Sequence, residues 1–157
     1  MDKFDRLLLK LLQDNAQMSV AELGESVGLS PSAAHRRVKA LEQAGIITGY
    51  RALLDGKALG LGLDVFVEIT LTSQSQRALD TFEDAVRDFD DILECHLMSG
   101  QSDYLLRVAA SSVADYDRIH RTCLARLPGV SAMHSRFTIR TIKNWNGYPV
   151  GVAAARE

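Results

Sequence analysis

Two short stretches of the sequence carry side chains that could bind another molecule. Residues 23–38 read LGESVGLSPSAAHRRV, so two serines precede a run of cationic side chains. Residues 99–107 read SGQSDYLLR, so a single acid follows a glycine in a bend. Hydroxyls and cations in this order bind phosphate oxygens, whereas an acid beside free backbone N–H groups can bind a small ligand that carries both charges.

The first stretch predicts a helix-turn-helix. Gly28 supplies the tight turn, and Gly24 lets the two helices approach closely. Ser30 followed by Pro31 predicts the cap and first residue of the second helix. Such a helix can enter the major groove of DNA, which is about 12 Å wide. The residues predicted to contact double-stranded DNA are Ser30, Ser32, His35, Arg36, Arg37 and Lys39.

These residues are expected to have different roles. Arg36 is the candidate for base-edge readout, because arginine pairs well with guanine. Arg37 and Lys39 are expected to contact phosphates, and the two serines at the helix N-terminus can hold a phosphate as well. The alternative is a solvated charged face on a three-helix bundle. For His35 the alternative is an exposed polar group.

The second stretch predicts a ligand site at a bend between two strands. Backbone N–H groups of Gly100 and Gln101 could hold a carboxylate, and Asp103 could pair with an ammonium group. Tyr104 could border an apolar pocket. These are the parts that an amino-acid site requires. The alternative is that the glycine serves only a tight turn.

Composition limits the other possibilities. The net charge is −2, yet residues 1–60 hold eight Lys or Arg against seven Asp or Glu, and three of these cations lie at 36, 37 and 39. No apolar run approaches the ~20 residues of a membrane-spanning helix, so we expect a cytoplasmic protein without a membrane partner. Cys95 and Cys123 fall in patterns typical of buried free thiols.

Enzyme chemistry has little support in the sequence. There is no phosphate-cradling glycine loop, no nucleophile elbow and no metal-ligand spacing among the four histidines. Cys95 and His96 are adjacent, but neighbours along a strand point to opposite faces, which argues against a catalytic dyad. We therefore expect no enzyme activity and no cofactor.

Residues 1–50 are predicted to form the DNA-binding domain. Apolar residues recur at helical spacing over residues 2–14, with Asp2 as the N-cap. Ser19 and Glu22 form a capping-box pattern that starts the second helix, and the third runs to about Ala44. Residues 46–54 are rich in strand formers and predict an extended segment or a small wing. Residues 51–61 are expected to form a linker.

Residues 62–143 are predicted to form a second domain of the α+β class. Alternating and helical periodicities follow in the order β-α-β-β-α-β, with the last strand over residues 130–143, which is the order of a ferredoxin-like fold. Both helices would cover one sheet face, so we expect a homodimer to cover the other. Residues 144–157 lack periodicity and predict a mobile tail, in which Trp145 and Tyr148 could still pack.

Several fragments together resemble the leucine-responsive/asparagine-regulator (Lrp/AsnC) family of transcription factors. They are Asp5 with Leu9 and Leu12, VGLSPS at 27–32, Arg37-Val38, Leu41-Glu42, Gly45-Ile46, FVEITL at 66–71, ECHLMSGQSDYLLR at 94–107 and LPGV at 127–130. The resemblance implies a winged-helix-type DNA-binding domain, a linker strand and a ligand-binding βαββαβ domain. It also implies dimers, often assembled into octamers, with effectors such as amino acids bound in clefts between dimers.

The resemblance also implies effector-binding positions. Those that match the family motif are Gly100, Asp103 and Tyr104, with Leu97 on the preceding strand. Arg136 and Thr138 occupy the last-strand region that can also border the effector. Apolar residues are often found there in the family, so this difference argues against leucine itself as the effector.

Two alternatives follow from the same resemblance. A divergent branch with a similar fold consists of sirohaem decarboxylases, which need cationic residues around the carboxylates of a tetrapyrrole. Here the basic residues remain on the predicted recognition helix, which favours the regulator. The other alternative is an amino-acid sensor without DNA binding, and the intact first domain argues against it.

Overall fold

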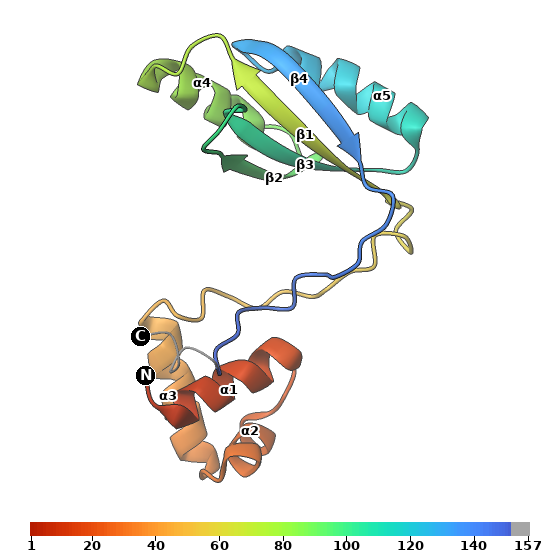
Figure 1. Ribbon diagram of the computed structural model, residues 1–157. Helices are drawn as coiled ribbons and strands as arrows, with labels where there is room; N and C mark the ends of the chain where they lie inside the picture. The colour runs from red at the N-terminus through yellow and green to blue at the C-terminus, as the bar shows by residue number, and fades with distance from the viewer. Residues whose placement is uncertain (152–157) are drawn as a thin grey trace. The chain divides into compact units, whose positions relative to one another are not determined.

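The computed structural model describes residues 1–151 and divides into two compact units. The helical unit consists of Met1–Leu53 and the segment that begins at Lys143. The sheet unit consists of Leu54–Ile142. The boundary after Leu53 falls within the linker expected at 51–61. Figure 1 shows the elements of both units.

Three helices form the helical unit, and the sequence places their ends correctly. They are α1 (Lys3–Asp14), α2 (Val20–Val27) and α3 (Pro31–Gln43). Asp2 and Ser19 each form a full capping box, and Ser30 caps α3 by accepting a hydrogen bond from the Ala33 N–H. These caps satisfy N–H groups that have no partner within the helix. The helices bury a small core of Leu8, Leu23, Ala34 and Val38.

The turn between α2 and α3 depends on two glycines. Gly28 adopts the left-handed conformation, with φ of 72°, and ends α2. Gly24 is buried, and a Cβ atom there would lie 2.7 Å from the Leu29 carbonyl oxygen. Both roles predicted for these glycines are confirmed.

Of the extended segment or small wing expected at residues 46–54, the structure contains an irregular segment and no wing strand. None of these described residues belongs to a strand, and Leu53 and Leu54 are exposed. A strand requires a paired edge, and the described part of this unit contains only helices and irregular segments. Ile47 instead packs against the helical core.

The segment after Lys143 contacts α1 rather than lying free. The Gln13 side chain donates to the Tyr148 carbonyl oxygen at 3.0 Å and accepts from the Tyr148 N–H at 2.6 Å. Arg6 donates to the Val150 carbonyl oxygen at 3.3 Å. Trp145 and Tyr148 pack edge to face. The mobile tail expected from residue 144 is therefore docked as far as Val150, and residues 152–157 lie outside the described range.

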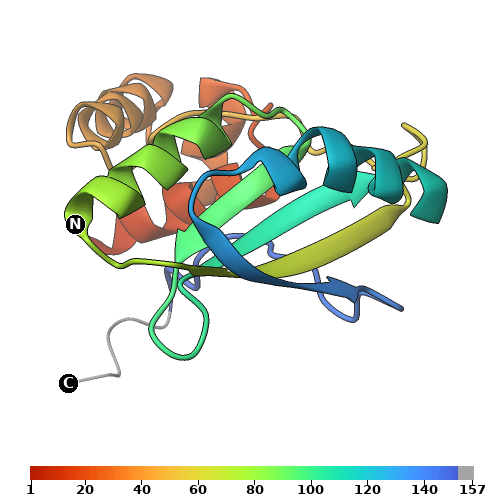
Figure 2. The same ribbon diagram turned by 90° about the horizontal axis from the view of Figure 1, so that it is seen from above.

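The sheet unit has the predicted β-α-β-β-α-β order. Its elements are β1 (Leu63–Leu71), α4 (Gln76–Arg87), β2 (Ile92–Leu97), β3 (Tyr104–Ala110), α5 (Val113–Thr122), a short 3₁₀ helix (Leu124–Arg126) and β4 (Val130–Phe137). The strands form one antiparallel sheet in the order β2-β3-β1-β4. Both α-helices cover the same face, as Figure 2 shows. The predicted α+β class is confirmed.

Buried and more exposed side chains alternate along β1 and β3, and the buried ones form the core between the sheet and the helices. Val65, Val67 and Ile69 face the helices with Leu106 and Val108 of the neighbouring strand, and all are fully buried. The last strand ends at Phe137 rather than at residue 143. The Thr138 N–H donates to the Asp64 carbonyl oxygen, and no pairing with β1 continues beyond that bond because β1 begins at Leu63.

The helix-free face of the sheet is charged as well as apolar. Arg107 pairs with Asp64 at 3.0 Å and with Glu94 at 2.9 Å, and Arg136 pairs with Glu68 at 3.0 Å. Phe66 lies between these pairs in register and is partly exposed. The face expected to need a dimer partner therefore carries ion pairs as well as an exposed aromatic ring.

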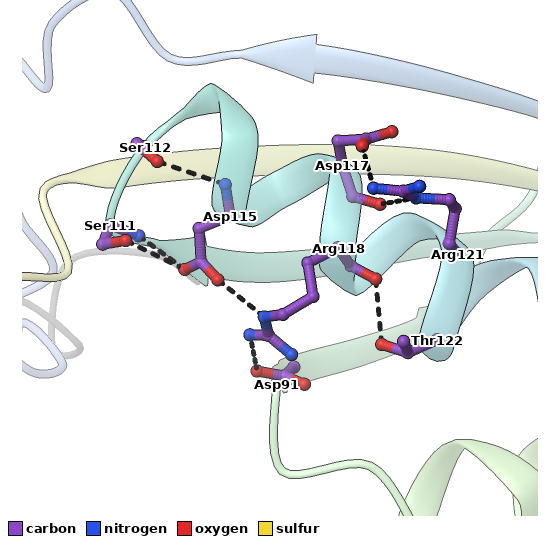
Figure 3. A network of polar contacts seen from close by, with 8 residues as sticks. All are labelled: Asp91, Ser111, Ser112, Asp115, Asp117, Arg118, Arg121 and Thr122. Carbon is purple, nitrogen blue, oxygen red and sulfur yellow. Dashed lines mark hydrogen bonds and ion pairs between the residues drawn. The ribbon is translucent and has the colours of Figure 1, made fainter.

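A polar network positions α5 (Figure 3). Asp115 accepts hydrogen bonds from the Ser111 N–H and hydroxyl, which together with Arg118 lower the pKa of its carboxyl. Arg118 pairs with Asp115 at 2.8 Å and reaches Asp91 at 3.5 Å. The network thereby ties the first turns of α5 to the turn that precedes β2.

Candidate DNA-binding surface and effector site

The outer face of α3 presents most of the residues predicted to bind DNA. Ser32, His35, Arg36 and Lys39 are exposed on this helix. The Ser30 hydroxyl accepts from the Ala33 N–H at 3.2 Å and lies 3.2 Å from the Ser32 hydroxyl. The helix therefore begins with two hydroxyl groups and N–H groups at its N-terminus, where the helix dipole favours a phosphate.

Arg36 and Arg37 are adjacent but have different surroundings. Among the described residues, no acid lies within ion-pair distance of Arg36. Arg37 instead binds Asp2 and Asp5, each at 2.8 Å, and its guanidinium lies over the Phe4 ring. The two carboxylates raise the pKa of Arg37. Arg37 thus ties α3 to the N-terminus of α1, which argues against its predicted role as a phosphate ligand.

Lys39 remains at the surface although it has a partner. Its ammonium group lies 2.6 Å from Glu42, which also accepts a hydrogen bond from the Tyr50 hydroxyl at 3.0 Å. Lys39, and after it Tyr50, lower the pKa of Glu42. Exposed ion pairs of this kind contribute little energy, so the Lys39 ammonium group can still turn to a phosphate.

The bend between β2 and β3 has the backbone that the sequence predicted. Gly100 has φ of 135°, a conformation that favours glycine. The Met98 N–H donates to the Asp103 carbonyl oxygen at 2.8 Å and closes the bend. Gly100 and Gln101 are exposed, and within residues 1–151 their N–H groups make no recorded hydrogen bond.

Asp103 has an architectural contact that the sequence did not reveal. Its carboxylate accepts from the Leu71 N–H at 2.6 Å and from the Gln74 side chain at 3.3 Å. The Asp103 N–H donates to the Ile69 carbonyl oxygen. The side chain thereby closes the end of β1, while its Oδ1 atom has, among the described residues, only a 3.4 Å contact with the Gln74 side chain.

Leu97 and Tyr104 line a cavity of about 360 Å³ between α4 and β2, here called the α4–β2 cavity. Its other lining residues are Glu83, Val86, Arg87 and Cys95. The Tyr104 hydroxyl donates to Glu83 at 2.8 Å, and its ring packs against Phe82 at 4.5 Å. Burial, together with Glu83, raises the pKa of Tyr104 far above its ordinary value.

The structure does not bring all predicted effector residues together within one chain. Arg136 lies near the end of β4 and Thr138 directly follows that strand, which is an edge strand on the opposite side of the sheet from β2. The Thr138 N–H bonds near the start of β1, whereas the Gly100 bend lies at the other end of β1. The sequence analysis also missed Glu83 and Arg87, whose i,i+4 spacing was the available signal that they share a helix face.

The fold and the two surfaces define a class of protein: a helix-turn-helix DNA-binding unit joined to a ligand-binding α+β unit. Comparison with known proteins agrees. Residues 1–48 match the winged helix-turn-helix DNA-binding family, and residues 64–147 match the Lrp/AsnC ligand binding domain. The chain belongs to the Lrp/AsnC family of transcriptional regulators.

Individual relatives cover between about three quarters and nearly all of the chain. It is 40% identical to the leucine-responsive regulatory protein of Haemophilus influenzae over 93% of this chain and 88% of that protein. It is 49% identical to an uncharacterised helix-turn-helix-type regulator of Sinorhizobium fredii over 74% of this chain and 91% of that protein. A transcriptional regulator of Neisseria meningitidis in complex with L-Met superposes with a TM-score of 0.91 at 33% identity, covering 98% of this chain and 99% of that chain.

Two further findings concern the described residues alone. No helix among them is long and apolar enough to cross a membrane. Cys95 and Cys123 are free, and burial raises the pKa of the Cys123 thiol to about 11.

Proposed function

We propose that this chain is a cytoplasmic, sequence-specific transcriptional regulator that reads DNA through α3 and responds to an amino acid bound in its sheet unit. The observation that carries the proposal is the exposed basic face of a properly capped α3. Its hydroxyls, its N-terminal N–H groups and two available cations have the chemistry that phosphates and base edges require. The names of the relatives support the same reading and favour a regulator over an enzyme.

We assign base readout to Arg36 and phosphate contacts to Lys39, with Ser30, Ser32 and His35 beside the DNA backbone. Arg36→Ala should weaken binding and relax base preference, because a bidentate contact to a base contributes ~1–3 kcal/mol of discrimination. Lys39→Ala should weaken binding to all sequences alike and lower the salt slope. Gel-shift titrations at several salt concentrations, with several DNA sequences, measure the affinity, the base preference and the salt dependence of each variant. Unchanged affinity and preference in Arg36→Ala would contradict the assignment.

We place the effector at the end of the sheet where β2 meets β3. Leu97, Gly100, Gln101 and Tyr104 would contact it, and Asp103 would hold the bend. The relative in complex with L-Met supports an amino acid as the class of ligand. Thermal-shift measurements with each of the twenty amino acids test this, because a ligand that binds only the folded state raises the melting temperature.

We also propose that the chain works as a homodimer, with octamers as the larger assembly. The helix-free sheet face supports a dimer, since a partner copy would cover the exposed Phe66 ring on it. Arg136 and Thr138 could then border an effector bound by another copy. Light scattering at micromolar concentration tests the assembly, and a stable monomer would contradict it.

A further inference from the structure

We propose that residues 143–151, here called the C-terminal segment, attach the helical unit to the chain a second time and thereby make DNA binding strict about the spacing between half-sites. Gln13 is the positioning residue that holds this segment. This role rests on the proposed function, a homodimer that reads DNA through α3. It adds a determinant of which DNA sites the two helical units of that dimer can reach together.

The chain passes between the two units twice (Figure 1). It leaves the helical unit after Leu53 and returns to it at Lys143. The return is short, because only residues 138–142 separate the end of β4 at Phe137 from Lys143. A chain of this length spans at most about 20 Å. Docking of the C-terminal segment is therefore an intramolecular step with a high effective concentration, so a few contacts are enough to hold it.

Gln13 binds the backbone of the C-terminal segment with both ends of its side-chain amide. The amide nitrogen donates to the Tyr148 carbonyl oxygen at 3.0 Å, and the amide oxygen accepts from the Tyr148 N–H at 2.6 Å. Paired strands exchange the same two bonds between backbones, whereas here a side chain makes them. Arg6, about two turns earlier on α1, donates to the Val150 carbonyl oxygen at 3.3 Å. The segment is therefore held along α1 at more than one point.

Gly147 allows the segment to approach Gln13 closely. A Cβ atom at position 147 would collide with the Gln13 side-chain oxygen, which could move away only by giving up its hydrogen bond to Tyr148. Gly147 also has φ of 93°, a conformation that favours glycine. Gly151 lies in the same segment without either constraint, since a Cβ atom there would meet nothing within 4 Å. The two glycines form a matched pair for testing the contact.

A second attachment limits how the helical unit can turn. A unit joined by one linker can turn about it, whereas a second connection closes a loop and removes part of that freedom. In a dimer, two such units must reach half-sites separated by whole turns of DNA. Freely turning units would adapt to other separations and discriminate weakly between them. Units held at two points have fewer arrangements, so they bind well only where the half-sites match.

Fluorescence of Trp145, the only tryptophan, tests the docking in the full-length chain. In wild-type protein the anisotropy should decay mostly with the rotation of the helical unit. Gln13→Ala removes two hydrogen bonds, so the docking equilibrium constant should fall by roughly four- to a hundredfold and a faster decay should grow. Gly147→Ala should have the same effect. The controls Gly151→Ala and Gln17→Ala, which changes an exposed glutamine beyond α1, should decay like wild type.

DNA with altered spacing tests the role of the docking. A site is selected from random DNA with wild-type protein, and about 5 bp, half a helical turn, is then inserted between its half-sites. In gel shifts, wild-type protein and Gly151→Ala should lose much more affinity for the altered site than Gln13→Ala and Gly147→Ala do. If the segment only stabilised the helical unit, both variants would bind both sites more weakly by the same factor, and the ratio would not change.

The failures of the two proposals are distinguishable. Wild-type anisotropy decay in both Gln13→Ala and Gly147→Ala would show that the segment is not held as described. If wild-type protein selects DNA and the released variants keep the wild-type ratio between the two sites, the spacing role is wrong while the regulator proposal stands. If wild-type protein selects no DNA, the proposed function fails and the spacing role fails with it, whatever the anisotropy shows.

Discussion

Among the described residues, the helical unit buries six hydrophobic side chains between three consecutive helices, whereas the sheet unit buries fifteen between a four-stranded sheet and its helices. In the helical unit, each helix start is set by a cap within three residues of it. In the sheet unit, the central contacts join residues about 40 positions apart or more, such as Val65 with Val108 and Phe137.

This difference explains why the sequence could predict the DNA-binding surface more easily than the cavity in the sheet unit. The residues proposed to bind DNA are neighbours along one helix, so their types and spacing were enough to propose them. The α4–β2 cavity collects side chains from a helix and two strands, and pairing with Leu106 sets the position of Cys95. A short helical unit with caps can be recognised from the local sequence pattern. A site between a helix and a sheet depends on how the strands pair in register.

The largest expected effect is a selective loss of the sheet unit. Phe82 is fully buried and packs on Tyr104, so Phe82→Ala should lower the free energy of unfolding of this unit by about 3–5 kcal/mol. Circular dichroism during denaturation measures the unfolding of both units together. Fluorescence of Trp145, the only tryptophan, reports on the helical unit, to which that segment belongs. An equal shift of the Trp145 transition would show that the units do not unfold separately.

The corresponding change in the helical unit is Gly24→Ala. Its new Cβ would meet the Leu29 carbonyl oxygen at 2.7 Å, and backbone cannot move away cheaply. Overpacking of this kind costs about 1–3 kcal/mol, and DNA affinity should fall because α3 is displaced. Gly28→Asn is the matched control, since its Cβ would have open space and asparagine tolerates the left-handed conformation. An equal loss of stability and DNA affinity in both variants would contradict the role of close helix approach at Gly24.

Alkaline pH should weaken the sheet unit more than the helical unit. Burial raises the pKa of Cys123 to about 11 and the pKa of Tyr104 further. A side chain whose pKa is raised by folding stabilises the folded state fully at pH values below its pKa in the unfolded chain, which is about 8.5 for cysteine. This stabilisation is lost as the pH rises through the pKa of the folded state. Melting of the sheet unit between pH 8 and 11 should therefore shift down more than the Trp145 transition. Cys123→Ala should flatten part of this dependence, and parallel profiles would contradict the comparison.

The smallest expected effect concerns Asp103. Asp103→Asn keeps an oxygen for the Leu71 N–H but loses the charge, so the free energy of unfolding should fall by about 1 kcal/mol. Effector affinity should change little, because the Asp103 carboxylate holds the bend through the Leu71 N–H. Denaturation and calorimetry on the same protein measure both quantities. A large loss of affinity with unchanged stability would return Asp103 to the role of ammonium ligand that its sequence position first indicated.

The sequence by itself determined the elements, the fold class and the DNA-binding helix. Local signals predict each of these features from a few neighbouring residues. They are the capping boxes at Asp2 and Ser19, the turn at Gly28 and the alternation of apolar and polar residues along β1. The last strand was expected to run to residue 143 but ends at Phe137, and residues 46–54 form no wing strand, because strand formers make a strand only where a partner edge exists.

Tertiary structure alone decided what individual charges do. Arg36 and Arg37 are identical, adjacent residues, yet only Arg37 faces Asp2 and Asp5 across the unit. Asp103 accepts a hydrogen bond from the Leu71 N–H, a contact that its place in the sequence does not indicate. Gln13 gave no sign that it would hold the backbone of Tyr148. The physical reason is that a hydrogen bond or ion pair depends on distances of a few ångströms between residues far apart in the chain, which sequence spacing does not contain.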